Sequence, residues 1–225
     1  MKTLNMLIAA AAALGAAGAA QANGLVVRSI GPSSKAYPAG KSLPDKASVS
    51  LKPGDVVTVL VSASTRTLRG PGTFTLAAAS PRAAAGFNPR ARFGAMRAGE
   101  IPASPSLWHV DVSQSGTFCV PSGQPVQLWR PESADPATLV IAPPGGAEQK
   151  LKWAAGEDTA VWPAALKLAP GAEYKLAFDG SADAAKLSFA DIGPLPEEPG
   201  AMAKAFIEKG CQSQLDLFID NTQSE

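Results

Sequence analysis

The sequence has 225 residues, with 20 basic and 19 acidic side chains and one histidine. A chain of this length can form one large domain or two small ones. Its balanced charge argues against a nucleic-acid-binding protein, which usually carries a basic excess, and its 20 prolines and 21 glycines indicate many turns between short strands.

The chain begins with a predicted signal peptide over residues 1–22. Lys2 supplies a positive start, Leu4 to Ala20 is apolar, and Ala20-Gln21-Ala22 has the small residues that signal peptidase reads. The alternative, a membrane anchor, is less favoured, because the apolar run is at the short end of the roughly 20 residues that a spanning helix needs. We therefore expect a soluble, exported mature protein that begins at Asn23 and has no later transmembrane segment.

Residues 23–78 are predicted to form a small β domain. Short runs typical of strands alternate with turns such as Lys52-Pro53-Gly54-Asp55. Gly70-Pro71-Gly72 is expected to reverse the chain after the strand at 65–68, which gives Gly70 and Gly72 a structural role.

The run from Ala47 to Leu60, followed by the strand with Arg66 and Arg69 and by Gly70-Pro71-Gly72, resembles FecR-like periplasmic domains over about residues 24–78. That family carries a strand, Lys-x-Gly-Asp, strand, short insert, strand, Gly-Pro-Gly pattern. The resemblance implies a periplasmic location in a Gram-negative bacterium and a role in an envelope sensing or signalling complex. Unlike FecR regulators, the chain shows neither a cytoplasmic N-terminal segment nor an internal transmembrane helix, so we do not expect it to signal to a sigma factor alone. Arg66 and Arg69 are candidate partner-binding residues.

Residues 79–105 are predicted to form a basic linker or loop rich in alanine, glycine and proline. Six arginines and no acidic residue lie between Asp55 and Glu100. The favoured interpretation is that these arginines keep an exposed segment solvated. The alternative is contact with an anionic membrane surface, lipopolysaccharide or an acidic partner.

Residues 106–193 show a stronger β pattern, in which Trp108, Val110 and Val112 alternate with polar side chains. The segment Leu168-Ala169-Pro170-Gly171-Ala172-Glu173-Tyr174 resembles the Leu-x-Pro-Gly-x-x-Tyr corner of fibronectin type III and immunoglobulin-like sandwiches. The resemblance implies that the Tyr174 hydroxyl bonds a nearby backbone group and has a structural role. A jelly roll is the alternative topology.

Residues 194–225 are predicted to form a helical tail. Met202, Phe206 and Ile207 recur at helical spacing, and Gly210 is placed to end that helix. Two cysteines in an oxidising compartment allow one intramolecular pairing, Cys119–Cys211, which would hold the tail on the second β domain. The alternative is two free buried thiols.

Few residues suggest catalysis. His109 is the only histidine, so any Ser-His-Asp arrangement must include it, but no nucleophile motif accompanies it and a solvated strand face is the favoured interpretation. Neither a metal nor a cofactor is expected, because the chain lacks the ligand clusters that such groups require.

Trp129, on the opposite phase from Leu128, is expected to be exposed and, with Arg130, to be a second candidate binding surface.

Together these features predict an all-β protein: a small FecR-like module, an immunoglobulin-like β-sandwich and a short helical tail tied by a disulfide. The expected function is non-enzymatic binding of an envelope or periplasmic protein. The alternatives are a carbohydrate- or cell-wall-binding module that uses exposed tryptophans on a cell-surface glycan, and, less favoured, a hydrolase that acts through His109.

Overall fold

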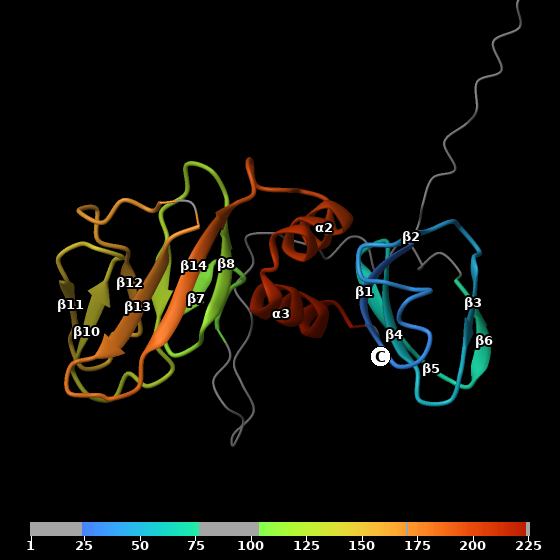
Figure 1. Cartoon of the computed structure of the whole chain (residues 1–225), viewed down its shortest axis with the longest axis horizontal. Helices are drawn as coiled ribbons and strands as arrows, with labels where there is room; N and C mark the ends of the chain where they lie inside the picture. The colour runs from blue at the N-terminus through green and yellow to red at the C-terminus, as the bar shows by residue number, and fades with distance from the viewer. Residues whose placement is uncertain (1–23, 77–103, 170, 224–225) are drawn as a thin grey trace, which may run out of the picture.

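The computed structural model describes residues 24–76, 104–169 and 171–223. The predicted signal peptide and nearly all of the predicted basic segment lie outside these ranges. The described part is rich in β-structure and ends in two helices (Figure 1), as the sequence predicts.

The N-terminal β unit consists of two facing sheets. The larger sheet is antiparallel, with the strand order β2-β1-β4-β5, and the smaller one pairs β3 with β6. A buried aliphatic cluster that includes Val26, Val49 and Val57 lies between them. The bounds are β1 (Gly24–Ile30), β2 (Ser42–Leu43), β3 (Ser48–Leu51), β4 (Val56–Val61), β5 (Ser64–Arg69) and β6 (Gly72–Thr75).

Strand β4 indicates that the larger sheet is covered on both of its faces. Its sequence Val-Val-Thr-Val-Leu-Val is nearly continuous in apolar residues, and five of its six side chains are buried. Strand β3 instead alternates exposed and buried residues. A continuous apolar strand is typical of a sheet that is covered on both faces, and the second face of this sheet is covered by the C-terminal helices.

The second β unit also has two sheets around one core. A five-stranded sheet has the order β11-β10-β13-β14-β8, with β8 parallel to β14, and a three-stranded sheet has the order β12-β9-β7. Both sheets contribute to one buried cluster, in which the Trp162 ring packs edge-on against Tyr174 and Phe189. The bounds are β7 (His109–Asp111), β8 (Gly116–Val120), β9 (Gln127–Trp129), β10 (Ala137–Ala142), β11 (Gln149–Trp153), β12 (Thr159–Val161), β13 (Glu173–Phe178) and β14 (Ala185–Asp191).

Two short helices close the described chain, α2 (Pro199–Lys209) and α3 (Gln212–Thr222). Pro199 occupies the first turn of α2, where its missing N–H costs no hydrogen bond. Gly210 ends α2 at φ 72°, a left-handed conformation that glycine adopts without steric penalty. The connection is so short that Cys211 directly precedes α3.

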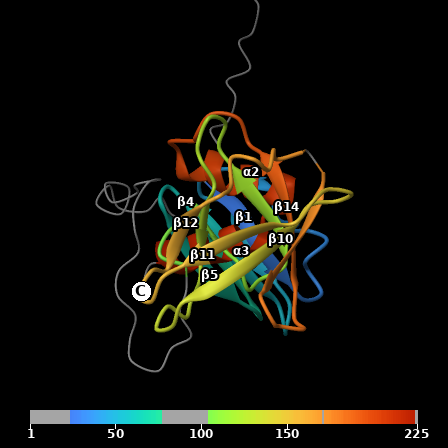
Figure 2. The same ribbon diagram turned by 90° about the vertical axis from the view of Figure 1, so that its left-hand side faces the viewer.

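The helices lie between the two β units (Figure 1). Figure 2 views the molecule from the end that carries β10, β11 and β12, with the helices and the N-terminal unit behind them. A third buried cluster joins Leu25 and Leu60 of the first unit, Cys119 of the second, and Phe206 and Phe218 of the helices. The sequence predicted that the tail packs on the second unit; the structure adds that the same helices also pack on the first.

Asp55 holds the turns of the N-terminal unit together. Its carboxylate accepts hydrogen bonds from the backbone N–H groups of Ser33 and Lys52, and its side chain is buried. Burial disfavours the charged carboxylate, but the hydrogen bonds from Ser33 and Lys52 outweigh it, so the pKa of Asp55 is lowered. The Lys52-Pro53-Gly54-Asp55 turn therefore has a structural role.

The Gly70-Pro71-Gly72 segment, predicted to reverse the chain, does not connect two strands that pair with each other. Strand β5 pairs with β4, whereas β6 pairs with β3 in the facing sheet. The segment crosses from one sheet to the other, and a Cβ atom at Gly70 would overlap the carbonyl oxygen of Lys52. Gly70 is therefore needed for close backbone approach.

Candidate binding site at the helix–sheet junction

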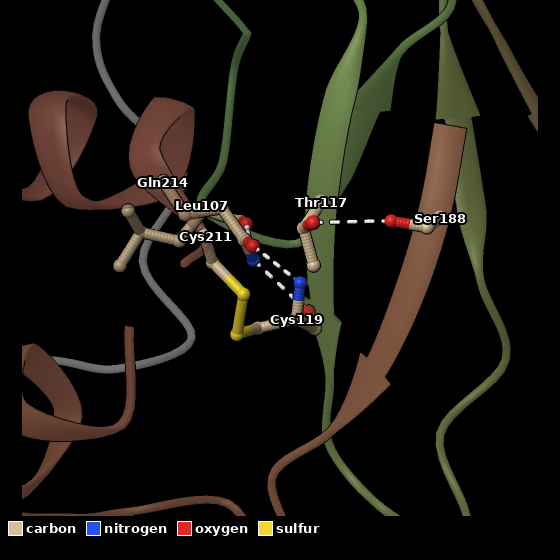
Figure 3. Close-up of a disulfide and its surroundings, with 6 residues drawn as sticks. All are labelled: Leu107, Thr117, Cys119, Ser188, Cys211 and Gln214. Atoms are coloured by element: carbon tan, nitrogen blue, oxygen red, sulfur yellow. Dashed lines mark hydrogen bonds between the residues drawn. A yellow bond between two sulfur atoms is a disulfide. The ribbon is translucent and has the colours of Figure 1, made fainter. Parts of the chain in front are cut away.

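The junction between α3 and β8 is fixed by a disulfide. Cys119 and Cys211 pair as the sequence predicts, with their Cα atoms 5.7 Å apart and both side chains fully buried (Figure 3). The bond spans 92 residues of sequence. It attaches the start of α3 to the last strand of the five-stranded sheet.

Gln214 makes a second, polar connection at the same place. Its Oε1 accepts a hydrogen bond from the Cys119 backbone N–H at 2.6 Å, and its Nε2 donates to the carbonyl oxygens of Cys119 at 3.0 Å and Leu107 at 2.9 Å (Figure 3). The side chain is 2% exposed. Because an amide has the same donor and acceptor as a peptide group, Gln214 takes the place of a neighbouring strand at this point of the sheet edge. The sequence interpretation missed it, although a glutamine on the same helix face as Leu215 and Phe218 is the signal that could have identified it.

Polar contacts also attach α3 to the first β unit. A bulge at Val27 shifts the register of β1 against β4, and Arg28 forms an ion pair with Asp216 of α3. The Thr65 hydroxyl donates to the carbonyl oxygen of Ile219 at 3.1 Å. Since α3 bonds both units, it positions them relative to each other.

A groove with a volume of about 250 Å³ lies between β7, β8 and α3. Its described lining includes three carboxylates and one histidine but no lysine or arginine. Arg28, which is not part of the lining, pairs with Asp216, so Asp111 and Asp220 give the groove its acidic character. It is built on elements that the disulfide and Gln214 hold in place. The polar side chains that line it are Ser104, Ser106, His109, Asp111, Gln114, Ser115, Thr117, Ser213, Gln214, Asp216 and Asp220.

His109 and Asp111 both line this groove, but the Asp111 carboxylate is hydrogen-bonded to residues that follow it closely in the chain. Asp111 accepts hydrogen bonds from the backbone N–H and hydroxyl of Ser113, at 2.9 and 2.6 Å, and from Gln114 Nε2 at 3.0 Å. These contacts close the turn after β7. They account for Asp111 without a catalytic role.

The expectation that Trp129 is exposed is wrong. Trp129 does lie on the opposite phase from the buried Leu128, yet it is only 5% exposed. Strand β9 is the central strand of its sheet, so Trp129 is flanked by Thr159 of β12 and Asp111 of β7. Alternation along a strand predicts which face a side chain is on, but not whether that face is covered.

Arg130 is buried as well, at 3% exposure. Its guanidinium donates to four backbone carbonyl oxygens and lies 5.5 Å from the centre of the Trp153 ring. An arginine whose donors are used in this way stabilises the loops around it and is not accessible to a partner. The carbonyl groups belong to Ser133, Asp135, Ala154 and Glu157.

The other candidate residues differ in accessibility. Arg66 and Arg69 are exposed on β5, which is an edge strand of the first unit. They do not line the acidic groove.

Tyr174 has the structural role that the sequence predicts. Its hydroxyl donates to the carbonyl oxygen of Lys167 at 2.8 Å and accepts from the Ala169 N–H at 2.9 Å, so it stabilises the turn that precedes its own strand.

Comparison with known proteins finds no family model, no curated protein and no solved structure that matches this chain. Among the described residues, no helix is long and apolar enough to cross a bilayer. The FecR-like and immunoglobulin-like resemblances therefore remain predictions from the sequence.

Proposed function

We propose that this protein is an exported, non-enzymatic interaction protein that binds a protein partner in the bacterial envelope. The observation that carries the proposal is the acidic groove beside α3, on a junction fixed by a disulfide and by the Gln214 amide. A binding site built on elements held in place loses little conformational entropy when a partner binds.

The order of the strands supports an immunoglobulin-like sandwich for the second unit. Strands β10, β13 and β14 are antiparallel neighbours, and β8 adds to β14 in parallel. The Tyr174 hydroxyl bonds the backbone of Lys167 and Ala169 upstream, which supports the proposal because a tyrosine corner makes contacts of this kind. Domains of this architecture serve in recognition in many proteins, but that link rests on fold alone.

A periplasmic location fits the same features. The buried Cys119–Cys211 disulfide is of a kind that persists in oxidising compartments, and the predicted signal peptide would deliver the chain there. We further propose that the N-terminal unit is FecR-like and that the protein acts within an envelope sensing or signalling complex. The Lys52–Asp55 turn, which Asp55 stabilises, supports that resemblance.

The experiment is capture of partners from an envelope extract with the mature protein from Asn23 onward, with mass-spectrometric identification. Two surfaces are separated by charge reversal: Asp220→Lys in the groove, and Arg66→Glu with Arg69→Glu on β5. The control is Lys152→Glu with Lys175→Glu, which reverses two exposed charges of the second unit. A partner whose capture falls with one of the first two variants and not with the control supports the proposal; capture that no variant changes contradicts it.

The glycan-binding alternative loses its proposed platform. Three of the four tryptophans are at most 7% exposed, and the half-buried Trp108 packs on Phe206 at 5.9 Å between ring centres. Capture of polysaccharide or lipopolysaccharide alone in the same experiment would reinstate this alternative. Hydrolysis that is lost in a His109→Ala variant would instead favour the enzyme.

A further inference from the structure

The edge of β8 is only partly covered by α3. Strand β8 is the last strand in the order of its sheet, so no described strand pairs with its outer side. The N–H and C=O of Cys119 point to that outer side, because both are bonded by Gln214. Backbone groups alternate sides along a strand, so Thr117, two residues before Cys119 in β8, directs its N–H and C=O groups the same way. Ser115 directly precedes the strand.

These outward groups lie in the acidic groove. Ser115, Gly116 and Thr117 all line it, and Gly116 has no side chain that could block the edge. No atom lies within 4 Å of the position that a Cβ atom would occupy at Gly116. Figure 3 shows Thr117 and Cys119 on β8, with Gln214 of α3 beside Cys119. The helix therefore covers the edge at Cys119 and leaves it accessible towards Ser115.

We propose that this groove binds an extended, positively charged polypeptide segment, which adds to the outer edge of β8 as a short strand along Ser115 to Thr117. Backbone hydrogen bonds to an accessible sheet edge provide affinity without requiring a particular sequence. Asp111 and Asp220 line the groove with no lysine or arginine in its described lining, whereas the third carboxylate, Asp216, is paired with Arg28; the two carboxylates without an ion pair favour basic side chains on the incoming segment. The Gln214 amide already makes this type of contact with the next outward-facing residue, Cys119.

The direct test uses fluorescence anisotropy with two labelled peptides of about eight residues. One alternates valine with lysine and the other alternates valine with glutamate. The mature, oxidised protein is expected to bind the lysine peptide and not the glutamate peptide. Equal binding of both peptides, or binding of neither, would overturn the proposal.

Two substitutions separate strand addition from simple charge attraction. Thr117→Pro removes an outward N–H, and proline is tolerated on an edge strand whose N–H side faces solvent; we expect affinity for the lysine peptide to fall about tenfold. Thr117→Val keeps the backbone donor and should bind as the wild type does. If Thr117→Pro and Thr117→Val bind equally well, and only Asp220→Lys weakens binding, the contact is electrostatic and strand addition is wrong. Glu148→Lys, an exposed charge reversal outside the groove lining, is the control.

Hydrogen exchange gives a readout that does not depend on a folded proline variant. The lysine peptide should slow exchange of the Thr117 amide in the wild-type protein, and unchanged exchange there would contradict the proposal. The inference rests on the proposed binding function, but the two can fail separately. If an envelope partner is captured equally by Thr117→Pro and Thr117→Val, the binding function stands and the strand-addition mode does not.

Discussion

Gln214 is the residue on which the helix–sheet junction most depends. It lies on the buried face of α3, where apolar side chains would otherwise be expected, and it bonds three backbone groups that are shielded from water. A buried polar group that loses its partner costs more than an ordinary hydrogen bond contributes, because the group is not resolvated. This asymmetry makes the glutamine difficult to replace.

The substitution Gln214→Leu is expected to lower the free energy of unfolding by about 2–4 kcal/mol, since it leaves buried N–H and C=O groups without partners. Urea denaturation of the oxidised protein measures the change. Gln212→Leu places the same substitution at an exposed position of α3 and should change stability by no more than about 0.5 kcal/mol. Equal effects of the two substitutions would contradict the role given to Gln214.

Arg130 should behave as a structural residue and not as a binding one. Arg130→Met removes the donors to four backbone carbonyl groups, and we expect a loss of about 2–4 kcal/mol. Arg66→Met, at an exposed position, should alter stability by less than about 0.5 kcal/mol. Thermal unfolding of both variants tests this; a stable Arg130→Met protein that has lost its partner would restore the binding interpretation.

The carboxylate of Asp55 should make stability depend on acid pH. Its pKa is lowered in the folded protein: burial acts against ionisation, and the Ser33 and Lys52 hydrogen bonds outweigh it. A carboxyl group with a depressed folded pKa stabilises the protein above its unfolded value, near 3.8, and that stabilisation is lost as the pH falls through the folded pKa. Urea midpoints measured between pH 7 and pH 2 should therefore decrease less steeply in Asp55→Asn than in the wild type below about pH 4. Parallel profiles for the two proteins would show that Asp55 is not responsible.

At the scale of elements, the disulfide and the α2–α3 pair act together. Cys211 occupies the position between the two helices, so the bond to β8 fixes the point where the chain turns from one helix into the next. Phe206 of α2 and Phe218 of α3 pack against each other at 6.5 Å in the same buried cluster. The covalent bond therefore stabilises the packing of both helices.

Replacing Cys119 and Cys211 together by serine is expected to lower the free energy of unfolding by about 4 kcal/mol, because the bond closes a long loop in the unfolded chain. Denaturation of the double variant beside the oxidised wild type measures this. The wild-type protein unfolded in the presence of a reductant is the matched comparison, and it should approach the stability of the variant. A variant as stable as the oxidised wild type would mean that packing alone holds the tail.

Much of this level of structure could be predicted from the sequence. Alternating runs and turn residues located most strands, and helical spacing with Gly210 located α2. Alternation did not reveal that Trp129 is buried, because its burial depends on β7 and β12, which are distant from it in sequence. The Gly70-Pro71-Gly72 sequence also did not reveal which strands would pair on either side of it. Strand β5 pairs with β4 and β6 pairs with β3, and these partners depend on how the whole sheets assemble.

At the scale of the whole molecule, the position of the C-terminal helices between two β units could not be predicted. The predicted tail was amphipathic, and an apolar helix face does not specify which sheet it covers. Here the helices cover both: Leu25 and Leu60 of the first unit share a buried cluster with Cys119 of the second. The acidic groove depends on the packing of α3 against the second unit, because it combines β7 and β8 with α3, which lies about 100 residues later in the chain.

Nitrogen-15 relaxation on the mature, oxidised protein tests this joining of the two units most directly. Because α3 bonds both units through Arg28, Thr65, Gln214 and Cys211, the amides of β1 to β6 and of β7 to β14 should report one shared rotational correlation time. Two distinct and shorter correlation times would show that the units tumble independently, and the joining of the two units by α3 would then be contradicted.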